Sequence, residues 1–534
     1  MVSEGLGHVA SQTRPEVARG AGDREHGRSS GAARPRSKVA RSRVARGRQG
    51  VLALAAMSPS SPSPLPSRDT LSFVHHRWEQ DVLPALIRYI EIPAKSPAFD
   101  HEWSAHGHLD RAAALIEDWS RRRPIEGLTV ETVRLPGRTP VILMEVPGTA
   151  PETILLYGHC DKQPEMTGWA EGLGPWIPVR RGDRLYGRGA QDDGYAAFCA
   201  LTAIEAVQQA GAPHARLVVL IEASEESGSP DLPAYMEAFA ARIGEPHLVI
   251  CLDSGCGNYE QLWGTTSLRG VINGVLTVEV LSEGVHSGAA SGIVPSSFRI
   301  ARQLLSRIED ERTGALVRDF HVGVPPARAA EARSVAKVLT AEAAERFPVV
   351  DGMSYAQEDP VSLLLANTWE PALSITGAAG LPTPEDGGNV LRPFTSLKLS
   401  LRIPPTLDAA RANRRLKEIL EADPPYGARV RYESSNPSPG WDAPATQPWL
   451  TDAVQAASER HFGKPAMFKG LGGSIPFMAM LGERFPKAQF FITGTGGPGS
   501  NAHGPNEFLH VPYAERLTSC VADVIAAHYA ARRS

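Results

Sequence analysis

Four runs of consecutive apolar residues constrain the fold of this chain more than any other feature. They lie at residues 154–157, 217–221, 248–252 and 490–492, and each is followed by glycine, threonine or an acidic residue. A strand with one exposed face alternates apolar and polar side chains, whereas a strand covered on both faces is apolar throughout. The runs therefore predict a sheet with helices on both faces, which is typical of largely parallel α/β sheets.

Segments with a helical spacing of apolar residues lie between and beside these runs. Residues 73–93, 106–122 and 193–211 place apolar side chains three and four positions apart. Gly211 stands just past the end of the third segment, where a helix often stops. Strands that alternate with helices in this way predict an α/β domain.

The pattern changes between residues 267 and 439. Strands and helices follow one another there in the order β-α-β-β-α-β, which is the order of a ferredoxin-like α+β domain. Additional sequence, roughly residues 310–365, interrupts that order. The α/β pattern resumes from Trp441. We therefore expect the second domain to be inserted into the first.

These patterns divide the chain into four parts. A chain of 534 residues is too long for one ordinary core. We expect four parts in chain order. They are a disordered extension at 1–70, the first half of a catalytic domain at 71–266, the inserted domain at 267–439 and the second half of the catalytic domain at 440–534.

The extension has an unusual composition. Residues 1–56 carry eleven basic and four acidic residues and are rich in glycine, alanine and serine, a composition typical of disorder. Met57 offers an alternative start, in which case these residues would not be translated. A nucleic-acid role for the basic segment would require that they are.

The overall composition restricts the function classes. The net charge is −4, so we expect the chain to bind neither nucleic acid nor membrane surfaces as a whole. No apolar run reaches the ~18 residues of a membrane span. The five cysteines are odd in number and scattered, which does not form a disulfide framework and favours a cytoplasmic location.

Side chains that bind metals or move protons follow the predicted strands. His159 and Asp161 come after the first run, Glu225 and Glu226 after the second, and Asp253 after the third. The carboxyl ends of parallel strands meet at one edge of a sheet, where ligands collect. We therefore expect these residues to converge.

Two further residues join this set. His503 follows the fourth run, and Asp192 lies just before a predicted helix. Each residue alone has an ordinary structural explanation, such as a hydrogen-bonded histidine, a helix cap or a solvated glutamate. Together, two histidines and three carboxylates suit a pair of divalent ions, with Zn²⁺ the best fit and Mn²⁺ or Co²⁺ as alternatives. One further carboxylate would then act as base rather than ligand.

The motifs "GHCD", "YGRGAQDDG", "EASEESGS", "CLDSG" and "NAHGPNE" resemble, in order, those of the dinuclear zinc peptidases and amidohydrolases. That family includes carnosinases, nonspecific dipeptidase, aminoacylase and succinyl-diaminopimelate desuccinylase. The resemblance spans roughly residues 75–530. The stretches "GWAEGLGPWIPVRRGDRLYGRGAQDDGYAAF" and "GGSIPF" are most similar to the carnosinase-like dipeptidase branch.

The resemblance implies a role for each residue at the strand ends. Asp192 would bridge the two metal ions. Glu225 would be the general base, and Asp161 would hold the ring of His159. The peptide bond before Asp193 would be cis. The remaining ligands would be divided as His159 with Asp253 on one ion, and Glu226 with His503 on the other.

The resemblance also implies roles for the inserted domain. His286 would reach the active site of a second subunit and stabilise the oxyanion, so a homodimer would be required, with the inserted domain as lid and dimerisation domain. Arg402 would bind the C-terminal carboxylate of the substrate. Gly473 and Ser474 would add hydrogen bonds to that carboxylate, and Asn389 is a weaker candidate for substrate contact.

These expectations combine into one predicted activity. The chain would hydrolyse dipeptides or short peptides with a free carboxylate, using a metal-bridging water activated by Glu225. The alternative within enzymes is an N-acyl-amino-acid amidohydrolase with the same site. A non-catalytic peptide-binding relative would lack a metal ligand or the general base. This sequence has all the predicted metal ligands and the predicted base. A serine hydrolase is disfavoured because no G-x-S-x-G motif occurs.

Overall fold

The computed structural model describes residues 65–339, 347 and 349–533. Residues 1–64 of the predicted extension therefore lie outside the described residues. The predicted boundary at residue 71 is too late, because helix α1 already spans Ser67–Arg77. Leu65 is only 3% exposed, and its carbonyl accepts a hydrogen bond from Arg460 at 3.0 Å. Burial of this leucine extends the ordered domain toward the N-terminus.

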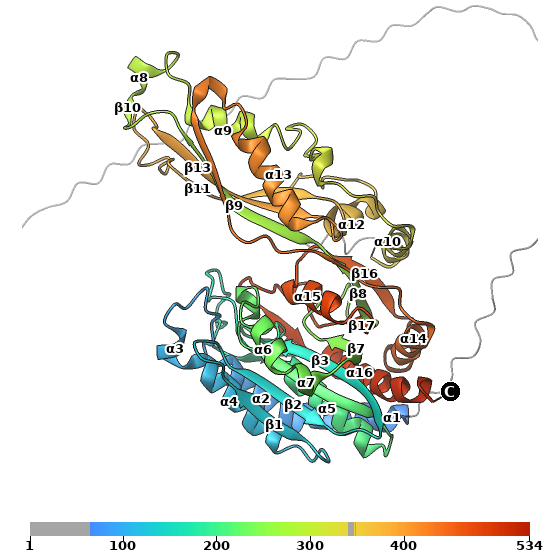
Figure 1. The fold of residues 1–534 in the computed structure, drawn as a ribbon. Helices are drawn as coiled ribbons and strands as arrows, with labels where there is room; N and C mark the ends of the chain where they lie inside the picture. Colours follow the sequence, from blue (N-terminus) through green and yellow to red (C-terminus); the bar gives the residue numbers. More distant parts are fainter. Residues whose placement is uncertain (1–64, 340–346, 348, 534) are drawn as a thin grey trace, which may run out of the picture. The chain divides into compact units, whose positions relative to one another are not determined.

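A nine-stranded sheet forms the centre of the α/β domain (Figure 1). Its strands follow the order β1-β2-β6-β3-β7-β17-β8-β15, and β16 also pairs with β8. In chain order the strands are β1 (Thr129–Val133), β2 (Val141–Val146), β3 (Ala150–His159), β6 (Ala215–Glu222), β7 (Pro246–Cys251), β8 (Trp263–Leu268), β15 (Trp441–Asp442), β16 (Met467–Leu471) and β17 (Gln489–Ile492).

The four predicted apolar runs are the four central strands. β6, β3, β7 and β17 are neighbours and run parallel to one another. The flanking pairs β1–β2, β2–β6 and β8–β17 are antiparallel. The carboxyl ends of the four parallel strands therefore lie at one edge of the sheet, as the sequence predicts.

Helices cover both faces of this sheet. One apolar cluster joins the strands to helices on one face, and a second cluster joins them to helices on the other. The first face carries α1, α2 (Leu83–Ile90), α4 (His108–Arg121), α5 (Ala196–Gln209), α14 (Pro448–Phe462) and α16 (Val511–Ala531). The second face carries α6 (Leu232–Ala238), α7 (Ala240–Ile243) and α15 (Pro476–Arg484).

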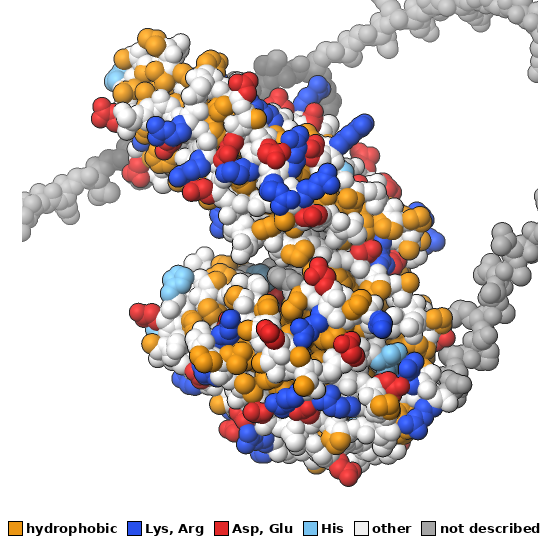
Figure 2. All heavy atoms as spheres, in the orientation of Figure 1, with side chains coloured by type: hydrophobic (Ala, Val, Ile, Leu, Met, Phe, Trp, Pro, Cys, Tyr) orange, Lys and Arg blue, Asp and Glu red, His pale blue; other side chains and the backbone are white. Residues whose placement is uncertain are grey.

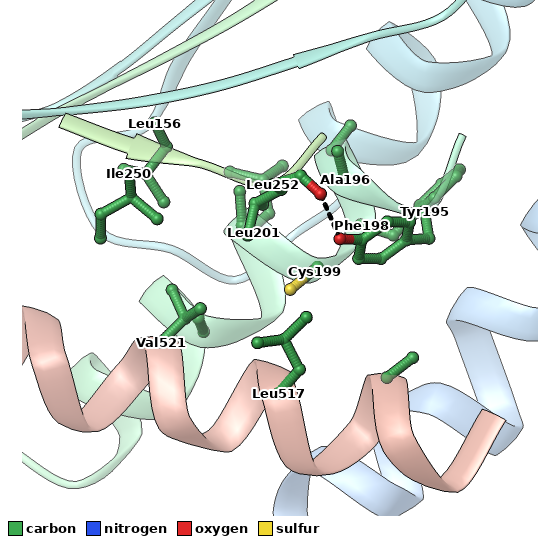
Figure 3. Packing of buried hydrophobic residues seen from close by; sticks show 14 of the residues in the cluster. Leu156, Tyr195, Ala196, Phe198, Cys199, Leu201, Ile250, Leu252, Leu517 and Val521 are labelled. Carbon is green, nitrogen blue, oxygen red and sulfur yellow. Dashed lines mark hydrogen bonds between the residues drawn. The ribbon is translucent and has the colours of Figure 1, made fainter. Parts of the chain in front are cut away.

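Helix α5 is buried because it lies between the sheet and α16 (Figure 3). Cys199 on α5 and Leu517 on α16 face each other in this layer, and both side chains are fully buried. The Tyr195 hydroxyl, just before α5, donates to the carbonyl of Leu252. This bond anchors the start of the helix to the chain segment just beyond β7.

The inserted domain contains a four-stranded antiparallel sheet of order β11-β13-β9-β14. With its helices the chain order is β-α-β-β-α-β, and this strand order is the ferredoxin-like one, as predicted. The elements are β9 (Gly270–Glu279), α9 (Ser297–Leu305), β11 (Ala372–Ala379), β13 (Phe394–Ile403), α13 (Ala409–Glu421) and β14 (Arg429–Ser434).

The additional sequence inside this domain divides between the two cores, because Leu316 and Phe320 join the core of the inserted domain and the two helices that follow do not. Helices α10 (Pro326–Val338) and α12 (Pro360–Thr368) lie against each other and against β16 of the large sheet. Val335 and Leu339 belong to the apolar cluster of the α/β domain. The linear boundaries 267–439 therefore include a segment that returns to the catalytic domain, because its apolar side chains are buried there.

Shorter elements complete the description. β4 (Val179–Arg181), β5 (Arg184–Tyr186) and β18 (Phe508–His510) form a small sheet. β10 (Val285–His286) pairs with β12 (Val390–Leu391) in the inserted domain. The remaining short helices are the π-helical turn η1 (Trp78–Val82), α3 (Trp103–His106), the 3₁₀ turns η2 (Glu225–Ser227), η3 (Arg318–Phe320) and η4 (Pro425–Gly427), and α8 (Ser287–Ala290).

Charged side chains of both signs are interspersed on the face shown in Figure 2. Over α13, basic side chains pair with acidic neighbours: Arg415 lies 2.6 Å from Asp319, and Lys417 lies 2.7 Å from Glu421. None of the helices among the described residues is both long and apolar enough to cross a membrane.

A buried histidine pair lies where α16 meets the start of β7. His528 Nε2 is 2.9 Å from Nδ1 of His247, and His528 Nδ1 is buried without a hydrogen-bond partner in the described structure. Trp449, Glu152 and Arg532 surround the pair. Burial and the neighbouring His247 lower the pKa of His528 to about 4.

We predict that His528 makes the fold sensitive to acid. Because its pKa is lower in the folded protein than the ordinary 6.5, its neutral form contributes stability above pH 6.5, and this contribution is lost as the pH falls from 6.5 toward 4. At pH 5 the loss is about 2 kcal/mol of unfolding free energy. Denaturant unfolding at pH 7.5 and pH 5 should show a smaller pH effect for His528→Leu than for the wild type. Equal effects in both proteins would contradict the prediction.

Candidate metal centre

The predicted residues meet at the carboxyl edge of the parallel strands. His159 is the last residue of β3. Glu225 and Glu226 begin η2, which follows β6, and Asp253 comes two residues after β7. Because β6, β3 and β7 are neighbours, their ends bring these side chains together although they are far apart in the sequence.

Two loops complete the group. Asp192 lies in the loop between β5 and α5, and His503 lies in the loop between β17 and β18. The peptide bond between Asp192 and Asp193 is cis, as the resemblance implies. The carboxylate of Asp193 accepts a hydrogen bond from the backbone N–H of His159 at 3.2 Å.

Asp192 lies between two halves of the centre. Its Oδ1 atom is 3.3 Å from His159 Nε2, and its Oδ2 atom is 3.0 Å from His503 Nε2. Asp253 Oδ1 is 3.9 Å from His159 Nε2, and Glu226 Oε2 is 3.4 Å from His503 Nε2. Asp253 thus lies near His159, and Glu226 lies near His503.

Glu225 lies beside the first half. Its Oε2 atom is 3.9 Å from His159 Nε2. The potential ligand atoms of His159, Glu225 and Asp253 lie within 4.8 Å of one another, as do those of His159, Asp192 and Glu226. Glu225 is therefore close enough either to join a metal ion or to act on a water molecule beside it.

Asp161 holds both neighbouring segments. Its carboxylate accepts hydrogen bonds from the backbone N–H groups of Glu225 at 3.1 Å and Glu226 at 3.0 Å. Its carbonyl oxygen lies 3.1 Å from His159 Nδ1, nearer than its carboxylate oxygen at 3.4 Å. The carboxylate thus fixes η2, and the backbone carbonyl is the closer partner of the histidine ring.

Burial changes the acidity of the carboxyl groups. Burial, with Asp253 nearby, raises the pKa of Glu225 well above its ordinary value. Burial, with Asp192 nearby, raises the pKa of Glu226 to about 8. Burial raises the pKa of Asp253 to about 6. Asp192 is the exception, because the two histidines outweigh its burial and lower its pKa.

The histidines respond to the same charges in the opposite direction. Burial alone would lower the pKa of His159, but Asp161 and Asp192 outweigh it and raise that pKa well above the ordinary value. For His503, Asp192 and Glu226 outweigh burial and raise the pKa to about 9. These raised pKa values favour the protonated forms of the two histidines and of most of the carboxyl groups. Bound cations would replace these protons.

The side chains fit divalent cations. His159 Nε2 is completely buried and has no hydrogen-bond partner in the described structure. It faces oxygen atoms of Asp192, Asp253 and Glu225 at 3.3–3.9 Å. A buried nitrogen without a partner is costly, and a cation between it and these oxygens would satisfy all of them.

A third group of potential ligands is a poorer candidate. His75, Glu79 and Glu515 lie close together, with His75 exposed and Glu515 buried. Arg180 already binds both carboxylate oxygens of Glu79, at 2.7 and 2.8 Å. The charge of this glutamate is thus already neutralised by Arg180, so its carboxylate would bind a cation less strongly.

The predicted substrate residues divide into two sets. Arg402 on β13 donates to Ser474 Oγ at 3.1 Å, so these two lie together, next to Gly473. His286 on β10 is exposed, and the backbone carbonyl of Asn389 accepts from the adjacent N–H of Ser287 at 2.9 Å. Within the described residues, neither His286 nor Asn389 forms a hydrogen bond or ion pair with the metal-centre residues.

Several residues that support the centre were missed in the sequence. Lys162 is completely buried and donates to the carbonyls of Tyr89 and Ile92 at 2.7 and 2.8 Å. It thereby joins the turn after His159 to the end of α2. Directly after "GHCD", a lysine reads as a solvated loop residue, so only its burial reveals this role.

A buried ion pair supports the other two loops. Arg188 and Glu507 are almost fully buried and lie 2.5 Å apart. Glu507 also accepts from the N–H of Gly189 at 2.9 Å, and Arg188 donates to the carbonyl of Gly504 at 2.9 Å. The pair connects the loop that carries Asp192 with the loop that carries His503. Both residues lie inside the quoted motifs, which was the available signal.

Comparisons with known proteins agree with this centre. Residues 155–527 match the model of peptidase family M20/M25/M40. A cysteinylglycine-S-conjugate dipeptidase of Corynebacterium striatum is 28% identical over 73% of this chain and 86% of its own length. The β-Ala-His dipeptidase of Homo sapiens is 26% identical over 70% of this chain and 74% of its own length.

Solved structures show the same fold. A di-peptidase from Saccharomyces cerevisiae aligns with a TM-score of 0.70 at 20% identity, over 87% of this chain and 98% of that one. Human carnosine dipeptidase 1 aligns with a TM-score of 0.69 at 19% identity, over 87% and 99%. Since the family model covers most of this chain and its named relatives are dipeptidases, the chain belongs to peptidase family M20/M25/M40 and is a metal-dependent peptide hydrolase.

Proposed function

We propose that this protein hydrolyses dipeptides or short peptides with a free C-terminal carboxylate, using two divalent metal ions. The observation that carries the proposal is the position of Asp192, whose two carboxylate oxygens face His159 at 3.3 Å and His503 at 3.0 Å. A carboxylate with one oxygen directed at each of two ligand sets is suited to join two cations.

The proposed ligands divide around Asp192. His159 and Asp253 would hold one ion, and His503 and Glu226 the other. The nitrogen and carboxylate donors favour Zn²⁺, with Mn²⁺ and Co²⁺ as alternatives. Ions bound there would lower the pKa of a water molecule and polarise the scissile carbonyl.

Glu225 is the proposed general base. It lies 3.9 Å from His159 and is not needed by either ligand set. Its backbone N–H is held by Asp161, which supports a defined orientation of the residue. Glu225 would take a proton from the attacking water and then deliver it to the nitrogen of the leaving amine, so the proton is returned in each cycle.

Arg402 is the proposed partner of the substrate's carboxylate. It is half-buried and has no carboxylate partner among the described residues, while Ser474 Oγ accepts one of its N–H groups. An arginine guanidinium suits a carboxylate. The Ser474 hydroxyl, which donates to the carbonyl of Arg269 in this structure, would turn toward the carboxylate of a bound substrate. Gly473 would add its backbone N–H. The names of the similar dipeptidases support short peptide substrates.

An N-acyl-amino-acid amidohydrolase remains the alternative activity. Its substrates carry the same carboxylate and the same amide bond, so Arg402 and Glu225 would act in the same way. Only the pocket for the acyl group would differ. Substrate tests, rather than the metal centre, must separate the two.

We also propose a homodimer formed through the inserted domain. His286 is exposed, and so are the apolar side chains of Ile293 (82%) and Phe298 (42%). Exposed apolar side chains next to a predicted catalytic histidine support a subunit contact that would bring His286 to a second active site. Asn389, beside it, would move with it.

A cytoplasmic location belongs to the same proposal. All five cysteines are free and buried, so none is exposed to form a disulfide. This state fits a reducing compartment.

We predict that Asp192→Asn weakens both metal sites, whereas His503→Ala weakens one. Asp192 is shared, and His503 faces one half only. Titration of metal-free protein with Mn²⁺ should give two binding events for the wild type, each more than about 100-fold weaker in Asp192→Asn. One unchanged high-affinity event in Asp192→Asn would contradict the bridging role.

We predict that Glu225→Gln retains metal but loses activity. The amide keeps the shape of the side chain and cannot accept the proton, so kcat should fall about 1000-fold. Ala-Ala, carnosine and N-acetyl-alanine should be tested with both proteins, and metal content measured in both. Turnover of N-acetyl-alanine alone would favour the amidohydrolase. Loss of metal from Glu225→Gln would make Glu225 a ligand.

We predict that two inactive variants restore activity when mixed. In a dimer of His286→Ala and Glu225→Gln subunits, one site would combine an intact Glu225 with the other subunit's intact His286. Random exchange would restore about a quarter of the wild-type activity. Subunits should be mixed under conditions that allow exchange, with each variant alone as control. No recovery despite demonstrated exchange would show that His286 acts within its own subunit or not at all.

A further inference from the structure

Arg269 lies at the junction of the two sheets. It stands between the end of β8 at Leu268 and the start of β9 at Gly270. The residue is only 6% exposed. A buried arginine at a domain junction requires partners for its charge and its N–H groups.

The backbone and side chain of Arg269 bind one loop repeatedly. Its N–H donates to the carbonyl of Leu471 at 3.3 Å, and its Nε–H donates to the carbonyl of Gly472 at 3.2 Å. Its own carbonyl accepts the hydroxyl of Ser474 at 2.6 Å. These bonds hold the loop that contains Gly473 on both sides of that glycine.

The same guanidinium also binds the end of α12. Its Nη1 atom donates to the carbonyls of Ala366 at 3.1 Å and Glu370 at 3.0 Å. The last carbonyls of a helix carry partial negative charge, which favours a cation there. Glu370 contributes its carbonyl and not its carboxylate, so the interaction leaves the positive charge of Arg269 without a full counter-charge.

Arg269 and Arg402 together form a positive region without an acidic partner. Neither guanidinium lies within 4.0 Å of a carboxylate in the described part of the chain, and Arg269 lies close enough to Arg402 to be repelled by it. Burial, and then Arg402, lower the pKa of Arg269 to about 10. It remains charged at neutral pH, and an anion between the groups would relieve the repulsion.

We propose that Arg269 is a positioning residue that sets the preference for substrates with a free C-terminal carboxylate. Its guanidinium holds the carbonyl of Gly472, directly before the Gly473 N–H, and adds a second positive charge beside Arg402. This inference rests on the proposed role of Arg402. Arg269 does not itself touch the substrate, because the backbone carbonyls already accept its N–H groups.

The expected substrate class follows from this arrangement. A carboxylate between Arg402 and Ser474 gains from both positive charges, whereas a C-terminal amide gains from neither. Discrimination against peptide amides should therefore depend on Arg269 as well as on Arg402. The effect should appear mainly in KM, since Arg269 lies apart from the metal ligands and Glu225.

The experiment compares Ala-Ala with Ala-Ala amide as substrates. The measured quantity is the ratio of their kcat/KM values in the wild type, Arg269→Met and Arg269→Lys. Arg307→Met is the matched control, because Arg307 also binds only backbone carbonyls, those of Ile419, Ala422 and Asp423, beside α13 of the inserted domain. Metal content and thermal stability are measured for each protein.

We expect the ratio to fall about tenfold in Arg269→Met, which removes the second positive charge, and less in Arg269→Lys, which retains it. KM for Ala-Ala should rise while kcat and metal content stay close to the wild type. Arg307→Met should keep the wild-type ratio even where its stability falls.

Two results would overturn the proposal and are distinguishable. If Arg269→Met and Arg269→Lys are less stable but keep the wild-type ratio, Arg269 is only structural, and the role of Arg402 stands. If the wild type itself cleaves Ala-Ala and its amide equally well, the proposed role of Arg402 fails and this inference fails with it. Should Arg269→Met not fold, the ratio measured for Arg269→Lys decides the question.

Discussion

Asp192 directs one carboxylate oxygen at His159 and the other at His503, and the rest of the catalytic domain depends on keeping that carboxylate where it is. Around it, burial raises the pKa of Glu225, Glu226 and Asp253. So many carboxyl groups in one buried place repel one another unless cations or protons neutralise them. The repulsion between these buried carboxylates makes the centre suitable for divalent ions.

Buried cations outside the centre hold its loops in place. Lys162 binds carbonyls at the end of α2, Arg188 binds Glu507 and the carbonyl of Gly504, and Arg269 binds carbonyls of α12 and the Gly472 loop. A charged donor satisfies several buried carbonyls at once, which neutral side chains cannot do as well. Lys162 and Arg269 thus each join a loop to a helix, and Arg188 joins two loops.

The additional segment of the inserted domain links the two parts of the molecule. Helices α10 and α12 return to the large sheet and pack against β16. Arg328 on α10 binds Asp442 at 2.8 Å, and the end of α12 binds Arg269. The proposed carboxylate site is therefore supported by a segment that the chain supplies from within the inserted domain.

Much of the fold could be predicted from the sequence alone because its signals are local. The four apolar runs identify the central parallel strands, and the order of strands and helices in residues 267–439 identifies the ferredoxin-like sheet. The residues after each strand predict the candidate metal centre, since parallel strands end at one edge. The resemblance added the cis bond before Asp193, which is present, while the division of ligands between two ions stays a prediction.

The tertiary structure decided what depends on contacts between distant segments. The return of α10 and α12 to the large sheet has no local signal, because an amphipathic helix does not specify which of two sheets it covers. Lys162 and Arg269 resemble ordinary loop cations until their burial and their carbonyl partners are known. The sequence by itself determined which residues lie at the strand ends. Only the folded chain determined which buried charges orient them, because charge interactions depend on distances that no sequence pattern encodes.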